Sequence, residues 1–384
     1  MRVKPGLEVL LRDGHPLIAG RRIGLLTHPA AIDGDGRGAA DLLAADPRWA
    51  LVALFGPEHG IRGAAQAGEH VSSGTDPRTG LPIHSLYGAT RVPTPKMLAG
   101  IETLVVDLQD IGVRYFTYPS TVLGCVEAAA PLGIDVVILD RPAPLGGRRI
   151  EGGSLFEAQR SFVGVHPVPI RHGLTLGELM RLVAAERGSA EPAVVQVDGW
   201  TRGQWADETG LPWAAPSPNL PTLDAVLLYA GTCLAEGTNL SEGRGTAAPF
   251  TSVGAPWLDP AALAERLRAR GLAGVRVDPA RFTPTISKHE GVECRGVSFT
   301  VTDRDALRPV ELGLALLEDC IALSGEHIAW RDAAFDRLAG DPAVRQTLLE
   351  GASLDSLITR WRADAHAFAE RRARYLLYSD DGLS

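Results

Sequence analysis

The chain contains few cysteines, and their spacing excludes two common structural frameworks. Of its 384 residues four are cysteine, and none of them forms a C-x-x-C pair. This arrangement indicates neither a zinc knuckle nor a disulfide scaffold, so we expect small buried apolar side chains. The four are Cys125, Cys233, Cys294 and Cys320.

Long hydrophobic runs are also missing. No apolar stretch approaches the roughly 20 residues that a helix needs to cross a bilayer, so we expect no membrane span. The segment 1–6 lacks the apolar core of a secretory signal peptide. The protein is therefore expected in the cytoplasm.

The charge pattern argues against a nucleic-acid partner. The net charge is −8, from 38 basic and 46 acidic residues, and the basic residues form no stripe along the chain. Phosphate backbones are bound by clustered cations. The substrate is therefore expected to be neutral, or an anion held by local arginines. Only Lys4, Lys96 and Lys288 are lysines.

Motifs for metal, nucleotide and nucleophile chemistry are absent as well. The ten histidines show no H-E-x-x-H or other paired spacing, so no metal site is expected. No serine lies in a G-x-S-x-G turn and Cys125 has no evident base, which disfavours serine or cysteine hydrolysis. The segment 241–246 lacks the lysine of a phosphate loop and carries the acidic Glu242. We therefore expect no cofactor.

Four short apolar runs predict the centre of a parallel sheet. They consist mainly of Val, Ile and Leu, a composition typical of strands buried on both faces. Helical stretches lie between them, and Thr175–Glu178 is a capping box that opens a further helix. The alternation predicts a doubly wound α/β domain. The runs are 23–26, 51–55, 104–106 and 136–139.

The pattern changes after Phe250, which indicates a second domain. Alternating strands are expected near 275–277 and 296–302, among helices with Asp-Pro starts. A chain of 384 residues also exceeds the usual size of one core. We expect a catalytic α/β domain over 1–235 and a smaller α+β domain over 236–384, with the active-site cleft between them.

Polar residues follow each of the four apolar runs. In an open α/β sheet, ligands bind beyond the carboxyl ends of the strands, so these side chains are expected to converge on one rim. The long connection 60–97 is expected to form a wall of the site. The residues are His28 after the first run, Glu58 and His59 after the second, Asp107 and Asp110 after the third, and Asp140 and Arg141 after the fourth.

Two polar loops carry glutamates among glycines. One is Gly-Pro-Glu-His-Gly at 56–60, and the other is Glu-Gly-Thr-Asn-Leu-Ser-Glu-Gly-Arg-Gly-Thr at 236–246. Cleavage of a glycosidic bond needs one carboxyl group to protonate the leaving oxygen and a second carboxylate as nucleophile or base. The loops therefore favour Glu58 and Glu242 as the catalytic pair. The alternatives are a helix-start role for Glu58 and a surface ion pair for Glu242.

Further polar side chains are candidates for substrate contact. Arg114 lies in a strand-end loop, where a guanidinium can grip a carboxylate bidentately. Asp107 and Asp110 either hold Arg114 or contact the substrate, and Tyr118 is either a core residue or a platform for a sugar ring. The candidate substrate-binding residues are His59, Asp107, Asp110, Arg114, Tyr118, Asn219, Glu236, Asn239 and Arg244.

Several long motifs carry a family likeness. They are Gly-Pro-Glu-His-Gly at 56–60, Asp-Leu-Gln-Asp-Ile-Gly-Val-Arg-Tyr-Phe-Thr-Tyr at 107–118, Asp-Arg-Pro at 140–142, Ser-Pro-Asn-Leu-Pro at 217–221 and the loop at 236–246. Together they resemble the NamZ-type exo-β-N-acetylmuramidases, which form glycoside hydrolase family 171 and were long known only as a domain of unknown function. The likeness spans nearly the whole chain, including the tail 371–378.

The resemblance implies a Rossmann-like N-terminal domain, a smaller C-terminal domain and an active site in the cleft between them. It also implies a peptidoglycan-derived saccharide as partner, from whose non-reducing end N-acetylmuramic acid is released. Glu58 matches the motif glutamate, while Glu242 and Glu236 compete for the second role. Either Arg114 or Arg244 is then expected to bind the lactyl carboxylate of the sugar.

Other functions stay open on the sequence. A non-catalytic protein that binds cell-wall sugars would use the same cleft, and a hydrolase of wall peptide amide or ester bonds is a further alternative. Many proteins of the resembled family are exported, which leaves open whether the substrate is wall material outside the cell or recovered fragments inside it. The stereochemical outcome, the oligomeric state and the substrate length are also open.

Overall fold

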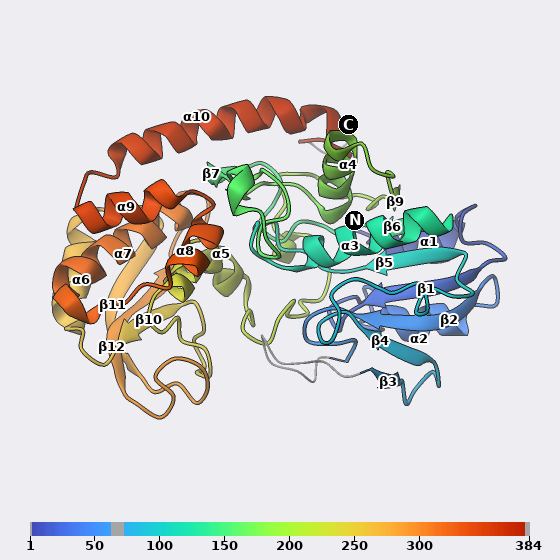
Figure 1. Ribbon diagram of the computed structural model, residues 1–384, viewed down its shortest axis with the longest axis horizontal. Helices are drawn as coiled ribbons and strands as arrows, with labels where there is room; N and C mark the ends of the chain where they lie inside the picture. The colour runs from blue at the N-terminus through green and yellow to red at the C-terminus, as the bar shows by residue number, and fades with distance from the viewer. Residues whose placement is uncertain (1, 63–72, 381–384) are drawn as a thin grey trace.

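The structure, a computed structural model, describes residues 2–62 and 73–380. Figure 1 shows two bodies side by side, a larger one from the first part of the chain and a smaller one from most of the second, with a long helix running across both. The expected wall at 60–97 is described only in part, since 63–72 lie outside the described residues.

The larger body is built on a mostly parallel sheet, which confirms the predicted fold class. Over the described residues this sheet has seven strands in the order β3-β4-β2-β1-β5-β6-β9, and only β3 and β4 pair antiparallel. The four apolar runs form its central strands, as predicted. The strands are β1 (Arg22–Thr27), β2 (Ala50–Gly56), β3 (Gly74–Thr75), β4 (Pro82–Ser85), β5 (Thr103–Asp107), β6 (Asp135–Leu139) and β9 (Ala193–Val195).

Helices cover both faces of this sheet, as a doubly wound domain requires. Leu25 and Val105 belong to the apolar core shared with the first two helices, and Leu26 and Val106 belong to the core shared with the next two. The predicted capping box at Thr175 opens the fourth helix. The helices are α1 (Gly6–Asp13), α2 (Ala39–Ala45), α3 (Tyr118–Ala129) and α4 (Leu176–Arg187), with 3₁₀ turns η1 (Ala130–Leu132), η2 (Glu157–Gln159) and η3 (Ala206–Glu208).

The smaller body packs helices around an antiparallel sheet, as an α+β domain does. Within the described residues that sheet has three strands in the order β10-β12-β11. Its strands are β10 (Ser252–Ala255), β11 (Val275–Phe282) and β12 (Cys294–Val301). Its helices are α5 (Leu223–Thr232), α6 (Pro260–Ala269), α7 (Pro309–Ser324), α8 (Asp332–Ala339) and α9 (Pro342–Glu350), with 3₁₀ turns η4 (Cys233–Gly237) and η5 (Gly325–His327).

Helix α5 packs in the smaller body, although the expected boundary at 235 assigns it to the larger one. It lies against α7, and the two helices meet at Gly231 and Gly313. A Cβ at Gly231 would lie 1.7 Å from the carbonyl oxygen of Pro309, so only glycine permits this close crossing. The structure thus packs α5 against a helix of the smaller body, and the boundary at 235 stays a prediction.

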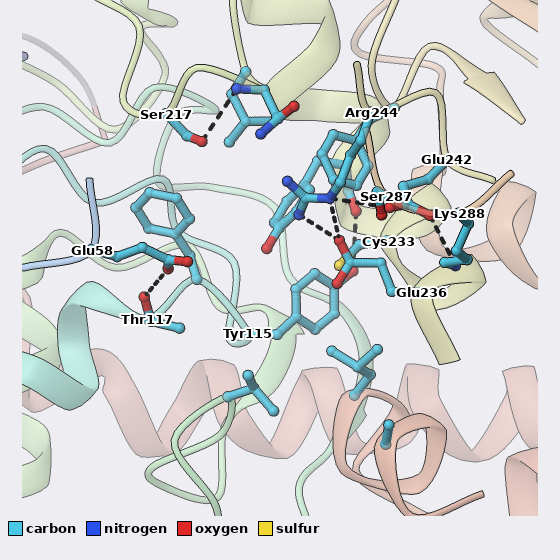
Figure 2. Close-up of a pocket in the computed structure, with 18 of the residues that line it drawn as sticks. Glu58, Tyr115, Thr117, Ser217, Cys233, Glu236, Glu242, Arg244, Ser287 and Lys288 are labelled. Carbon is cyan, nitrogen blue, oxygen red and sulfur yellow. Dashed lines mark hydrogen bonds and ion pairs between the residues drawn. The ribbon is translucent and has the colours of Figure 1, made fainter. Parts of the chain in front are cut away.

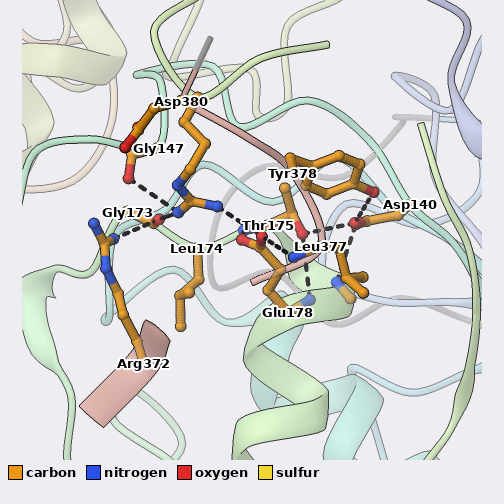
Figure 3. Close-up of polar contacts among 12 residues, drawn as sticks. Asp140, Gly147, Gly173, Leu174, Thr175, Glu178, Arg372, Leu377, Tyr378 and Asp380 are labelled. Atoms are coloured by element: carbon orange, nitrogen blue, oxygen red, sulfur yellow. Dashed lines mark hydrogen bonds and ion pairs between the residues drawn. The ribbon is translucent and has the colours of Figure 1, made fainter. Parts of the chain in front are cut away.

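The end of the chain returns to the larger body. Helix α10 (Asp355–Arg372) runs along the top of Figure 1 and packs against the hairpin of β7 (Glu151–Ser154) and β8 (Pro169–Arg171), before the turn η6 (Ala373–Tyr375). Figure 3 shows the tail that follows: the Tyr378 hydroxyl donates to Asp140 Oδ2 at 2.6 Å, and the Leu377 N–H donates to Glu178 Oε1 at 2.8 Å. Burial raises the pKa of Asp140 to about 6.

No helix in the described part of the chain is both long enough and apolar enough to cross a membrane.

Candidate active site

A cavity of about 650 Å³ is lined by residues of both bodies. Its size lies within the range of small-molecule sites. Figure 2 shows Glu58 and Thr117 on one side, and Glu236, Glu242 and Arg244 on the other. The lining residues that the sequence predicted are Glu58, His59, Asn219, Glu236, Glu242 and Arg244.

Glu58 lies just beyond the carboxyl end of β2. The hydroxyl of Thr117, which precedes α3, donates to Glu58 Oε2 at 3.0 Å. Burial raises the pKa of Tyr87 to about 12, and the neighbouring Glu58 carboxylate adds to the effect. His59 follows with φ 73°, a left-handed conformation that is uncommon outside glycine and is often found at functional sites. The turn after β2 thus holds Glu58 at the cavity wall.

The opposite wall is a cluster of two carboxylates and two cations. Arg244 donates to Glu236 Oε1 from Nη2 at 2.5 Å and from Nε at 3.1 Å, and Nε also lies 3.1 Å from Glu242 Oε1. The Lys288 ammonium lies 2.9 Å from Glu242 Oε2. Although burial opposes it, the charges of Glu236 and Glu242 hold the pKa of Arg244 above its ordinary range.

The two glutamates of this cluster differ in exposure. The Glu242 side chain is 2% exposed, and each of its oxygens lies beside a cation. The Glu236 side chain is 28% exposed, and both bonds from Arg244 end on its Oε1. Burial raises the pKa of Glu236, the Glu242 charge reinforces this effect, and Arg244 opposes it. Glu236 is therefore the more exposed of these two glutamates, which both line the cavity.

Lys288 joins this cluster to the loop that carries it. Its ammonium donates to the carbonyls of Ala235 at 2.9 Å, Thr238 at 3.1 Å and Leu240 at 2.5 Å, in addition to its contact with Glu242. The residues on either side of Lys288 have φ of 70° and 59°, which indicates a locally strained turn. Lys288 thus fixes the backbone around Glu236.

Aromatic rings form much of the remaining wall. Tyr115, Phe116, Tyr229 and Phe250 line the cavity. Tyr229 meets Phe250 edge to face at 4.7 Å, and Arg244 lies 4.9 Å above the Phe250 ring. Asn219 lines the same cavity, and its buried Nδ2 has no acceptor in the part of the chain that the structure describes. Aromatic rings with oriented polar groups among them are typical of a small-molecule site.

Comparison with known proteins identifies the family. Profiles for the N-terminal and C-terminal domains of the exo-β-N-acetylmuramidase NamZ match residues 23–224 and 227–378. The chain belongs to the NamZ family of exo-β-N-acetylmuramidases. This confirms the resemblance seen in the sequence motifs and the expected class of enzyme, a glycoside hydrolase.

Three known proteins align with almost the whole chain. The peptidoglycan β-N-acetylmuramidase NamZ of Bacillus subtilis (strain 168) is 42% identical over 379 residues, which are 98% of this chain and 92% of that protein. A crystal structure of a DUF1343 family protein from Bacteroides fragilis NCTC 9343 matches with a TM-score of 0.90 and 34% identity, over 98% of this chain and 99% of that one. A second DUF1343 structure from the same strain matches with a TM-score of 0.81 and 31% identity, over 99% and 100%.

Arg114, a predicted carboxylate ligand, is used elsewhere in this NamZ fold. It is 4% exposed and does not line the cavity. Its Nη1 donates to the carbonyls of Gly153 and Val168, and its Nη2 donates to those of Leu338 and Ala339, at 2.7 to 2.9 Å. Burial lowers the pKa of Arg114 to about 10. The guanidinium therefore caps the last carbonyls of α8 instead of binding a substrate.

Tyr118 and Asn239 are structural as well. The Tyr118 hydroxyl donates to the carbonyl of Pro216 at 3.1 Å and lies 3.1 Å from His28 Nδ1, at 1% exposure. The Asn239 side chain bridges the carbonyl of His327 and the N–H of Ala329, both at 2.9 Å. Neither lines the NamZ cavity.

The strand-end residues share one edge of the sheet, but most of them do not line the first cavity. Asp107 holds Arg141 at 2.5 Å in a buried pair, and Arg141 lines a second cavity of about 290 Å³. Asp110 is 4% exposed, and burial raises its pKa to about 7. Asp140 binds the tail, as described above. Of the strand-end sets only Glu58 and His59 reach the first cavity.

Sequence reasoning missed several lining residues of the NamZ site. Lys288 carried a signal, since it is one of three lysines in the chain. Arg331 and Arg337 lie six residues apart around α8, a spacing that becomes informative only once that helix is known to face the cavity. Tyr229 lies in an apolar helix segment, and neither it nor Tyr87 gave a distinct signal.

Proposed function

We propose that this protein hydrolyses the β-glycosidic bond that joins a non-reducing-terminal N-acetylmuramic acid to the rest of a peptidoglycan fragment. The observation that carries the proposal is a cavity of about 650 Å³ lined by carboxyl groups from both bodies of the chain. The relative from Bacillus subtilis, a peptidoglycan β-N-acetylmuramidase, supports the choice of substrate.

Glu58 is the proposed general acid. It reaches the cavity from the end of β2, and the Thr117 hydroxyl fixes its Oε2 at 3.0 Å. A carboxyl group held in this way can deliver its proton to the leaving glycosidic oxygen. Once it has given up that proton, the same carboxylate can take a proton from the incoming water.

Glu236 is the proposed second carboxylate. The sequence favoured Glu242, but the contacts favour Glu236, because Glu242 is 2% exposed and lies between two cations. Arg244 occupies only Oε1 of Glu236, which leaves Oε2 to face the anomeric carbon. Negative charge there stabilises the oxocarbenium-like transition state. Glu242 then serves to hold Arg244 and Lys288 in place.

Three isosteric variants test these roles. Glu58→Gln and Glu236→Gln should each lower kcat on a muramic-acid disaccharide by roughly 100-fold or more, since acid or base catalysis contributes on the order of 100- to 10,000-fold. Glu242→Gln should lose less activity and more stability. Product is measured by mass spectrometry, and unfolding in urea checks the fold. Wild-type rates in the Glu58 or Glu236 variant would remove that residue from the mechanism.

A binding-only protein is the contrasting outcome. It would retain the disaccharide in a calorimetric titration and release no N-acetylmuramic acid on long incubation. Proton NMR of the fresh product gives the anomeric configuration, which reports whether Glu236 attacks the sugar or activates water. The compartment in which the enzyme acts stays a prediction.

A further inference from the structure

We propose that Arg331, the N-cap residue of α8, and Arg337 within that helix bind the lactyl carboxylate and so select muramic acid over neutral hexosamines. This inference rests on the proposed function and assigns a specificity role within the same cavity. Both side chains line that cavity and are exposed. Neither guanidinium has an ion pair or hydrogen bond to any residue in 2–62 or 73–380.

The charges in the cavity leave these two cations unmatched. Glu236 and Glu242 are paired with Arg244 and Lys288. Glu58 accepts from the Thr117 hydroxyl on the far wall. Counted together, the three carboxylates Glu58, Glu236 and Glu242 face the four cations Arg244, Lys288, Arg331 and Arg337, which leaves the cavity with an excess of one positive charge. A substrate that carries one carboxylate would complete the balance, whereas a neutral sugar would not.

Helix α8 separates its charges by face. Arg331, Ala334, Arg337 and Leu338 all line the cavity, at the spacing of one helix face. The two acidic residues of the helix turn away, since Asp332 lies 3.2 Å and Asp336 2.8 Å from Arg345 of α9. The sequence of α8 therefore presents cations, and no carboxylates, to the ligand.

The helix is fixed at its N-terminal end. The N–H of Arg331 donates to the carbonyl of Gly237 at 2.8 Å, and Thr238 forms a bridge with Trp330. A Cβ on Gly237 would lie 2.6 Å from the Cα of Phe335, so the turn that holds Glu236 packs directly on the α8 backbone. The distance between Arg331 and the second carboxylate is thereby set by the fold.

The helix is fixed at its C-terminal end by the larger body. Arg114 Nη2 donates to the carbonyls of Leu338 and Ala339 at 2.9 and 2.8 Å. These carbonyls have no partner within the helix, so a buried guanidinium satisfies them and ties α8 to both sides of the cavity. Arg337 is therefore held at a fixed position relative to Glu58. Recognition of a planar carboxylate by guanidinium groups depends on such fixed placement.

Two substrates that differ in one charge test the inference. They are a chromogenic aryl β-glycoside of N-acetylmuramic acid and the same glycoside with its lactyl carboxylate converted to a carboxamide. Wild-type enzyme should prefer the acid. Arg331→Met and Arg337→Met should each lower kcat/KM on the acid, and the double variant should lower it roughly 10- to 100-fold, as loss of a charge-assisted hydrogen bond predicts. Turnover of the carboxamide should stay within about twofold.

Two controls accompany these variants. Arg374→Met removes an exposed arginine that stacks on Tyr375, away from the cavity, and should leave both rates unchanged. The double variant Arg331→Lys with Arg337→Lys should restore part of the preference, because the charge returns without the planar fork.

The possible results separate this inference from the proposed function. If the double variant still prefers the acid as strongly as wild type does, or loses both substrates equally, the arginines do not read the carboxylate, while hydrolysis by the wild type stands. If wild-type enzyme cleaves neither glycoside, the proposed function fails and the inference fails with it.

Discussion

Replacing Lys288 by methionine should separate the stability of the catalytic loop from its chemistry. The side chain is 18% exposed and its ammonium contacts three carbonyls and Glu242 Oε2. Methionine keeps most of the length and removes all four contacts. Removing one partner of a buried ion pair costs about 3 to 5 kcal/mol. Because Arg244 still contacts Glu242, we expect the lower part of that range, about 3 kcal/mol of unfolding free energy.

A double-mutant cycle makes this prediction quantitative. Glu242→Gln should cost about 1 to 2 kcal/mol, since Lys288 keeps its carbonyl acceptors. The double variant should cost less than the sum of the two by about 1 to 2 kcal/mol, which is the coupling of the pair. Urea unfolding measures all three variants, with Lys96→Met as a control on an exposed lysine.

The same variant should also lose activity. The carbonyls of Ala235 and Thr238 flank Glu236, so releasing them displaces that carboxylate from the sugar. A misplacement of this kind costs roughly 100-fold in rate. The assigned role of Lys288 would be refuted if the stability losses of the two single variants add up to that of the double variant within about 0.5 kcal/mol. A wild-type kcat for Lys288→Met would refute it as well.

Two further changes test the packing around the site. Gly237→Ala should lower the free energy of unfolding by about 1 to 3 kcal/mol and reduce kcat/KM, because its Cβ would lie 2.6 Å from Phe335 Cα; equal stability in urea would contradict this contact. Tyr378→Phe should lower the free energy of unfolding by about 1 to 2 kcal/mol, and the loss should be larger at pH 8 than at pH 5. Burial raises the pKa of Asp140 to about 6 in the fold, so stability from Asp140 is present at low pH and declines as pH rises through about 6. The Tyr378 hydroxyl donates to Asp140, and this bond is stronger when the Asp140 carboxylate is ionised. Equal losses of unfolding free energy at both pH values would argue against this dependence on ionisation.

The sequence predicted the sheet well because its strands are continuous apolar runs. A segment such as 104–106, buried on both faces, has no other stable place than the centre of a parallel sheet. The α4 capping box at Thr175 and the Asp259 cap of α6 depend on local geometry alone and appear as predicted. Local patterns of this kind need no knowledge of the rest of the chain.

The site was predicted less completely, because its partners are distant in sequence. The sequence around Arg114 predicts a carboxylate ligand, but its acceptors include the backbone carbonyls of Leu338 and Ala339. Every residue has such a carbonyl, so the sequence does not show which ones a side chain will meet. The order of burial between Glu236 and Glu242 depends likewise on Lys288, which comes from another loop. Glycine-rich loops showed where the chemistry lies, and tertiary contacts decide which atoms perform it.

The return of α10 and the tail to the larger body restricts how the two bodies can separate. The chain crosses from one to the other near residue 224 and crosses back along α10 (Figure 1). Because the chain crosses at two separated places, the two bodies cannot move apart along a straight line. The connections alone would permit a rotation about the line that joins the two places. Such a rotation would also break the bonds from Arg114 to the carbonyls of Leu338 and Ala339, so we expect the two bodies to keep their arrangement while substrate enters and product leaves.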